Sequence, residues 1–150
     1  MDNENFESRA EATWQGDLPT GNGTISFGTG AMPDVPVTWS ARTESSDGMT
    51  SPEELIAAAH ASCFSMALTN TLVTGGHQPE SLHVEAVVAF GPKDGGGMEV
   101  KSSVLTVRAR VPSLDQAGFQ EWAEKGEQGC PVSNALRGNI EITVEATLES

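Results

Sequence analysis

The chain has 150 residues, a length that suits one domain with a genuine hydrophobic core, so we expect residues 1–150 to form a single domain. Its 21 acidic residues outnumber the 8 basic ones, and the net charge of −13 makes nucleic acid and anionic membrane surfaces poor partners. The acidic, polar N-terminus does not have the composition of a signal or transit peptide, so we expect a cytoplasmic protein. In that compartment, two cysteines indicate catalysis, redox chemistry or metal binding rather than a structural disulfide.

Three strands are predicted before the first helix. We expect a flexible tail over residues 1–8, followed by strands at 9–14 and 24–27 that pair as a hairpin across a glycine-containing turn. Residues 35–43, with the sequence VPVTWSART, alternate between apolar and polar side chains and predict a third strand with Arg42 on its polar face.

The segment from Thr50 to Thr74 organises the rest of the chain. Ser51, Pro52 and Glu54 are typical of a helix start, as N-cap, first helical residue and capping-box acid. Most faces of the following helix carry apolar or small side chains, which predicts a buried central helix. A membrane span is the alternative of matching length, but polar residues interrupt the run and basic flanks are absent.

The remainder of the chain predicts two strands, two helices and a final strand. The strands cover residues 81–90 and 98–111, the helices 114–128 and 131–136, and the last strand 140–148. The order βββ-α-ββ-αα-β indicates an α+β protein with antiparallel sheets around a long central helix. Because three short N-terminal strands cannot wrap so apolar a helix, we expect a second subunit to bury it in an interlocked homodimer.

The two cysteines are the residues with the clearest chemistry. Cys63 and Cys130 are 67 residues apart, which is neither a CxxC motif nor zinc-finger spacing. Cys130 precedes Pro131 and so lies at the start of a short helix, where backbone N–H groups and the helix dipole lower the pKa of a thiol. Cys63 lies mid-helix in apolar surroundings, which raise its pKa unless a cation is close. The residues alone leave open which cysteine attacks a substrate, but Cys63 needs a basic partner to do so.

Three side chains are candidate partners of Cys63. Arg42 lies shortly before the long helix. His60 lies one helical turn before Cys63 and is either a base or a core histidine bonded to a carbonyl group. Glu53 complements the helix dipole, but it is ten residues before Cys63, about 15 Å along a helix axis. It would therefore join the site from a neighbouring subunit or hold Arg42 from a distorted helix start.

Two segments resemble the OsmC/Ohr family of thiol peroxidases. They are SPEELIAAAHASCFSMAL and GCPVSNALRGNIEITVEATL, and both occur in the order and at the separation found in the family. The Ala-Ala-His-Ala run before Cys63 is similar to the OsmC (osmotically inducible protein C) branch. The RGNI run after Cys130 also appears in the Ohr branch, so an Ohr-type organic hydroperoxide resistance protein is the alternative. The resemblance covers residues 9–149.

The resemblance implies an intertwined α+β homodimer whose active sites lie at the interface. Cys63 would be the peroxidatic residue, Cys130 the resolving residue, and Arg42 and Glu53 would support the site. The implied reaction reduces organic hydroperoxides, and hydrogen peroxide more weakly, through a Cys63 sulfenic acid and a Cys63–Cys130 disulfide. An external dithiol, for which a lipoyl-type compound is one candidate, would then restore both thiols without any metal or organic cofactor. Such a peroxidase would serve in defence against oxidative or osmotic stress.

Two other classes of protein remain open from the residues themselves. A metal-binding module would use Cys63, Cys130 and His60 as ligands, and it predicts stoichiometric metal in the purified protein. A non-catalytic acidic binding domain predicts two inert thiols and no consumption of peroxide.

Overall fold

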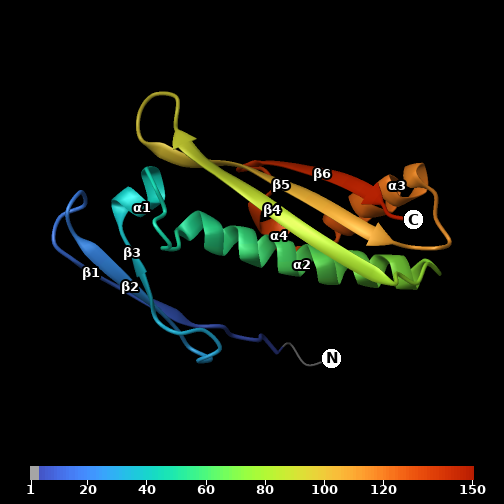
Figure 1. The fold of residues 1–150 in the computed structure, drawn as a ribbon, viewed down its shortest axis with the longest axis horizontal. Helices are drawn as coiled ribbons and strands as arrows, with labels where there is room; N and C mark the ends of the chain where they lie inside the picture. The colour runs from blue at the N-terminus through green and yellow to red at the C-terminus, as the bar shows by residue number, and fades with distance from the viewer. Residues whose placement is uncertain (1–3) are drawn as a thin grey trace. The chain divides into compact units, whose positions relative to one another are not determined.

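The structure, a computed structural model, describes residues 4–150, and its chain divides into two compact units that meet in sequence at residues 52 and 53 (Figure 1). The predicted tail at residues 1–8 lies partly outside the described residues. Its described part, residues 4–8, has no regular secondary structure and is exposed.

The first unit contains a three-stranded antiparallel sheet in the order β1-β2-β3. These strands are β1 (Ala10–Gln15), β2 (Asn22–Phe27) and β3 (Val35–Val37). The predicted hairpin between the first two strands is confirmed. Gly23 of β2 lies opposite Trp14 of β1, and a Cβ atom at Gly23 would lie 2.7 Å from the Trp14 ring. Glycine at this position therefore lets the indole lie across the neighbouring strand.

The predicted third strand is too long, because β3 ends at Val37 and a short helix follows. This helix, α1 (Trp39–Thr43), is capped by Thr38, whose hydroxyl accepts a hydrogen bond from the Ala41 backbone N–H at 3.1 Å. The cap offers the backbone an alternative to strand pairing, which the apolar-polar alternation alone does not reveal. Arg42 consequently lies in the last turn of a helix and not on the polar face of a strand. The element order gains one helix and becomes βββ-αα-ββ-αα-β.

The second unit contains a three-stranded sheet in the order β4-β5-β6. Its strands are β4 (Ser81–Pro92), β5 (Met98–Arg110) and β6 (Glu141–Leu148). The first two strands pair antiparallel, as predicted, whereas β6 runs parallel to β5. The prediction of purely antiparallel sheets is therefore wrong for this pair. The physical reason is that two helices connect β5 to β6, and a crossover of that length returns the chain in the same direction.

Helix α2 (Pro52–Thr74) begins at the predicted proline. Phe64, Leu68 and Leu72 follow at intervals of four residues on one face of α2, and all three are fully buried in the core of the second unit. By length and composition α2 is long and apolar enough to cross a membrane, a test that core helices also pass. Its apolar stripe packs against the sheet, which is the behaviour of a core helix.

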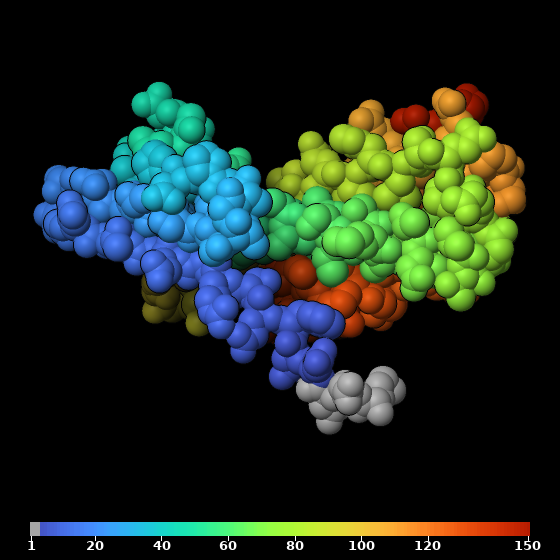
Figure 2. Space-filling view, turned by 90° about the horizontal axis from the view of Figure 1, so that it is seen from below, coloured from blue at the N-terminus to red at the C-terminus, as the bar shows by residue number. Residues whose placement is uncertain are grey.

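One face of α2 is exposed in the single chain, so one copy by itself does not bury the helix on all sides. The side chains of Met66 and Val73 are 68% and 46% exposed. In Figure 2 the green atoms of α2 lie at the surface beside the yellow-green atoms of β4. The sheet and the other helices of this unit cover one side of α2 and leave the apolar residues on its other side uncovered.

Helices α3 (Gln116–Gln128) and α4 (Pro131–Leu136) complete the second unit. The predicted start of α3 is two residues early, because Asp115 is its N-cap and accepts a backbone N–H of the first turn at 2.7 Å. Near its end, α3 passes close to α2, since a Cβ atom at Gly126 would lie 3.0 Å from the Leu68 Cα. Glycine therefore permits the two helices to touch at this point.

Two glutamines of α3 hold the outer edge of β6. Gln120 donates to the Val144 carbonyl at 3.1 Å and accepts from the Ala146 N–H at 2.9 Å. Gln116 donates to the Ala146 carbonyl and accepts from the Leu148 N–H, at 2.9 and 2.7 Å. These side chains bond backbone groups of β6 that a further strand would otherwise pair with. The open edge of the sheet is therefore hydrogen-bonded by the protein itself.

Candidate functional site

The structure brings together the two cysteines that the sequence singled out. Cys63 is half-buried on α2, and Cys130 is fully buried at the N-cap of α4. Both are free thiols, and the Cys63 thiol is hydrogen-bonded to the Cys130 thiol and to the backbone N–H of Val132. Two thiols that lie side by side are the starting arrangement from which oxidation forms a disulfide.

The first turn of α4 presents Cys130 for local reasons. Pro131 occupies the first helical position, where its missing N–H costs nothing. The Cys130 backbone is extended, and its Sγ accepts the backbone N–H of Ser133 at 3.5 Å. The predicted placement of Cys130 at the start of this helix is therefore confirmed, and its sulfur serves as the cap of the helix.

The chemistry of Cys63 is set by three effects on its pKa. Burial has the largest effect and raises the pKa of the thiol, as predicted for apolar surroundings. The Val132 N–H lowers the pKa by stabilising the thiolate, and the neighbouring Cys130 thiol raises it again. The net result is a pKa above the usual cysteine value. A thiolate, which is the nucleophilic form, therefore requires further positive charge at this site.

The remaining two predicted site residues lie in different units of the chain. Glu53 is in the first turn of α2 and is only 6% exposed. Arg42 belongs to the first unit, where its guanidinium group lies 5.8 Å from the centre of the Trp39 ring. Arg42 also lines a hollow of about 240 Å³, whose walls include the aromatic side chains of Trp14 and Trp39. The first unit thus places a cation at an apolar surface.

His60 is a fully buried residue with two serine partners. Its Nδ1 lies 2.7 Å from the hydroxyl of Ser103, and its Nε2 lies 2.7 Å from the hydroxyl of Ser133. The expected core histidine is confirmed, although its partners are hydroxyl groups and not a carbonyl. Because both ring nitrogens are occupied, His60 is not placed to take a proton from Cys63 or to bind a metal ion. Within residues 4–150, no group of three or more His, Cys, Asp or Glu side chains is arranged to hold a metal.

An ion pair that the sequence analysis missed joins the end of α3 to the end of α4. Arg137 Nη1 lies 2.9 Å from Oε1 of Glu127, a residue that is only 5% exposed. Nη2 of the same guanidinium donates to the Glu127 carbonyl at 3.3 Å and to Asn134 Oδ1 at 3.1 Å. The pair closes the stretch of chain that carries Cys130.

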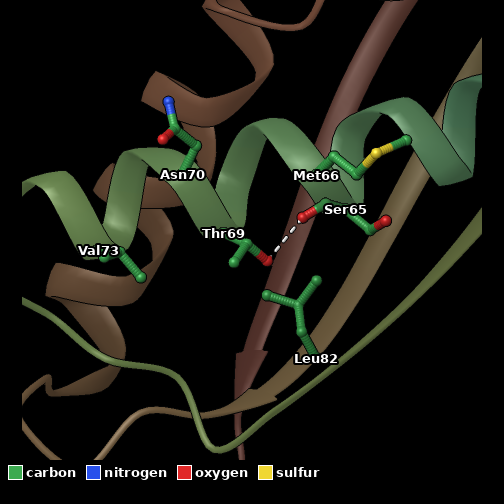
Figure 3. A pocket seen from close by; sticks show the side chains of 6 residues that line it. All are labelled: Ser65, Met66, Thr69, Asn70, Val73 and Leu82. Atoms are coloured by element: carbon green, nitrogen blue, oxygen red, sulfur yellow. Dashed lines mark hydrogen bonds between the residues drawn. The ribbon is translucent and has the colours of Figure 1, made fainter.

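The exposed face of α2 forms a groove of about 520 Å³ with one residue of β4 (Figure 3). Its floor and walls combine methionine, valine and leucine side chains with small polar ones, and the lining residues are Ser65, Met66, Thr69, Asn70, Val73 and Leu82. The Thr69 hydroxyl donates to the Ser65 carbonyl within the helix, at 2.8 Å. Hydroxyls bonded in this way leave the groove more apolar than its composition suggests.

Comparison with known proteins identifies the family. A family model described as OsmC-like protein matches residues 45–145, a range that contains Glu53, His60, Cys63 and Cys130. The chain belongs to the OsmC-like family. The resemblance of the two sequence segments is therefore confirmed.

Relatives of this OsmC-like chain have names from both branches. It is 38% identical over 145 residues to a protein named peroxiredoxin OsmC from Escherichia coli, covering 97% of this chain and 99% of the relative. It is 35% identical over 96 residues to an organic hydroperoxide resistance protein from Xanthomonas axonopodis pv. citri, covering 63% and 65% of the two chains. The match to the OsmC-named relative is thus the more extensive of the two.

Solved structures agree with the α+β fold of the OsmC-like chain. An organic hydroperoxide resistance protein from Elizabethkingia anophelis superimposes with a TM-score of 0.73 at 28% identity, covering 97% of this chain and 100% of that one. The organic hydroperoxide resistance protein OhrB of Bacillus subtilis gives a TM-score of 0.72 at 25% identity, covering 93% and 98% of the two chains. The fold class predicted from the sequence is therefore confirmed.

Proposed function

We propose that this chain is a cysteine-based peroxidase that reduces organic hydroperoxides to alcohols, and hydrogen peroxide to water more weakly. The observation that carries the proposal is the hydrogen-bonded pair of free thiols, Cys63 and Cys130. The names of the relatives, peroxiredoxin OsmC and organic hydroperoxide resistance protein, support the same reaction. The chemistry uses protein thiols and needs no prosthetic group.

In the proposed cycle Cys63 attacks and Cys130 resolves. The Cys63 thiolate attacks the O–O bond, the alcohol leaves with a proton, and Cys63 becomes a sulfenic acid. Cys130 then attacks the Cys63 sulfur, a disulfide forms, and water leaves. An external dithiol reduces the disulfide by two exchange steps and is itself oxidised to a disulfide. Cys63 is the better candidate for the attack because it is half-buried, whereas Cys130 is fully buried.

Arg42 and Glu53 complete this proposal as supporting residues. A cation beside Cys63 would offset the effect of burial on the pKa of its thiol, and Arg42 is our candidate for that cation. Glu53 would hold the guanidinium group in place by an ion pair. The apolar hollow beside Arg42 suits an alkyl or aryl hydroperoxide, which supports organic substrates over hydrogen peroxide.

A homodimer is part of the proposal, because α2 needs a partner for its exposed face. The groove in Figure 3 and the exposed Met66 and Val73 side chains provide an apolar surface that a second copy of the chain would cover. In this assembly the whole chain works as one domain. We propose a cytoplasmic location because regeneration needs a dithiol, for which a lipoyl-type compound is our candidate, in a reducing compartment. Defence against oxidative or osmotic stress is the corresponding role.

A single turnover tests the reaction and assigns the roles of the cysteines. Reduced protein receives one equivalent of tert-butyl hydroperoxide, the remaining thiols are counted, and the products are mapped by mass spectrometry. We expect the loss of both thiols and a Cys63–Cys130 disulfide, while Cys130→Ser stops at an oxidised Cys63 and Cys63→Ser leaves the peroxide unconsumed. Survival of both thiols in a large excess of peroxide would contradict the peroxidase and favour a non-catalytic domain.

A further inference from the structure

His60 connects three elements of the second unit, and the proposed reaction cycle gives it no part. It belongs to α2, and its ring bonds Ser103 of β5 on one side and Ser133 of α4 on the other, each at 2.7 Å. All three side chains are fully buried. A bridge of this kind inside an apolar core is costly unless every polar group is satisfied, and here the two ring nitrogens are both bonded.

The neutral form of His60 suits both serines at once. A neutral imidazole has one N–H donor and one nitrogen acceptor, and a serine hydroxyl is able to play either part. Burial lowers the pKa of His60, the carboxylate of Glu127 raises it, and the Arg137 guanidinium lowers it. The ring therefore joins the two hydroxyls without introducing a charge beside the thiols.

Ser133 links this bridge to the resolving cysteine. Its hydroxyl bonds His60, while its backbone N–H donates to the Cys130 sulfur at 3.5 Å. The same turn of α4 contributes the Val132 N–H that bonds the Cys63 thiol. His60 and Cys63 are neighbours on α2, one turn apart. The His60–Ser133 bond and the contact between the thiols are therefore two adjacent connections between α2 and the first turn of α4.

We propose that His60, acting through Ser133, positions Cys130 for its attack on the oxidised Cys63. This inference rests on the proposed peroxidase function and makes His60 a positioning residue of the second chemical step. In that step the Cys130 sulfur bonds the Cys63 sulfur, the S–O bond of the sulfenic acid breaks, and the hydroxyl group leaves as water with the Cys130 proton. Correct placement matters because a sulfenic acid that waits reacts with a second peroxide and becomes a sulfinic acid.

The two serines provide a matched pair of variants. Ser133→Ala and Ser103→Ala each remove one buried hydroxyl bonded to His60 at the same distance, but only Ser133 belongs to α4. We expect Ser133→Ala to slow disulfide formation about tenfold, which corresponds to about 1.4 kcal/mol. Ser103→Ala retains the bond from Nε2 to α4, so we expect it to slow the step less than about threefold at a similar loss of thermal stability.

The measurement separates the two chemical steps. Rapid quenching after tert-butyl hydroperoxide, followed by mass spectrometry, gives the rates of Cys63 oxidation and of disulfide formation. We expect Ser133→Ala to leave the first rate unchanged and to increase the fraction of Cys63 sulfinic acid in excess peroxide. His60→Gln, whose amide retains a donor and an acceptor at one end of the side chain, should be impaired less than His60→Ala. If both serine variants slow disulfide formation equally and neither accumulates extra sulfinic acid, His60 has only a structural role and the inference is overturned.

A second assay tests the positioning without any peroxide. Ellman's reagent converts Cys63 to a mixed disulfide, and Cys130 then displaces the second thionitrobenzoate as the Cys63–Cys130 disulfide forms. The rate of that second release should fall about tenfold in Ser133→Ala. If peroxide leaves the wild-type thiols intact while this difference persists, the peroxidase proposal fails and the positioning by His60 stands. If wild-type and Ser133→Ala proteins release the second thionitrobenzoate at the same rate, the positioning is wrong.

Discussion

At the scale of single residues, the environment of Cys63 is unfavourable for a nucleophile. Burial raises the pKa of its thiol, and within the second unit the Val132 N–H is the group that acts in the opposite direction. Reaction with peroxide requires the thiolate, so the proposed mechanism depends on added positive charge. That requirement makes the role of Arg42 testable through the ionisation of Cys63.

Replacement of Arg42 by Met should move the ionisation of Cys63 to higher pH. The guanidinium group stabilises the thiolate in our proposal, and methionine keeps much of the apolar volume without the charge. We expect the rate of Cys63 alkylation by iodoacetamide to reach its midpoint at a pH about one unit higher, with at least tenfold slower peroxide reduction at pH 7. Arg108→Met, at an exposed position of the central strand β5, is the matched control. An unchanged alkylation profile in Arg42→Met would remove Arg42 from the site.

His60 should make the folded protein sensitive to acid. Burial lowers its pKa in the folded chain, so below its usual pKa of about 6.5 the unfolded chain binds a proton that the folded chain does not. Its contribution to stability is therefore complete above that pH and decreases as the pH falls toward the folded-state pKa. The free energy of unfolding, measured with urea at several pH values between about 7.5 and 5, should decrease less on acidification in His60→Gln than in the wild type. If the free energy of unfolding decreases equally in the two proteins, His60 is not held neutral by burial.

At the scale of elements, helix contacts place the resolving cysteine. Helix α4 has only six residues, too few to be stable alone, and it is held by the His60–Ser133 bond and by the Glu127–Arg137 ion pair. Helix α3, which leads into it, is in turn held against α2 at Gly126. The position of Cys130 thus depends on packing between helices distant from it in sequence.

Gly126→Ala tests that packing. Alanine favours a helix by about 1 kcal/mol, but here the new Cβ would lie 3.0 Å from the Leu68 Cα, and backbone cannot move aside cheaply. We expect a net loss of about 1–3 kcal/mol in the free energy of unfolding, measured with urea. Gly129→Ala is the control, because its Cβ would meet its nearest atom at 3.8 Å and its φ of −93° suits alanine. A stabilised Gly126→Ala protein would mean that the helices are not in contact there.

At the scale of the whole molecule, charge and apolar surface act in opposite directions. A net charge of −13 on each copy opposes association, whereas the exposed face of α2 favours it. Moderate salt changes the apolar attraction little. It screens the electrostatic repulsion between charges that are more than about 8 Å apart, the Debye length at physiological ionic strength. A dimer of this chain should therefore be tighter in moderate salt than in dilute buffer.

The proposed dimer predicts a mass of twice 15.7 kDa in light scattering. Met66→Glu places a charge in the apolar groove and should shift the protein toward monomer by at least tenfold in the dissociation constant. Ala117→Glu, at an exposed position of α3, adds the same negative charge elsewhere and serves as the control. A wild-type protein that remains monomeric at 0.1 mM, about the upper range for a functional dimer, would contradict the assembly.

Local patterns were sufficient for most of the fold. The proline-started helix α2, the β1–β2 hairpin, the long β4–β5 pair and the short helix after Cys130 all follow from signals within a few residues of one another. The errors arose where two local preferences compete or where pairing joins distant segments. Thr38 turns a strand pattern into the cap of α1, and the direction of β6 depends on the crossover from β5.

The same division applies to the candidate site. The motifs around Cys63 and Cys130 determine the family and the residue types, because thiol chemistry needs those residues in any fold. Their contact, the bridge from His60 to two serines, and the Glu127–Arg137 ion pair join residues 10 to 73 positions apart in the chain. No short sequence pattern encodes such pairings, since they arise only when α2, β5 and α4 pack around one core. The composition of the chain therefore sets its chemistry, and the packing of its helices sets which groups meet.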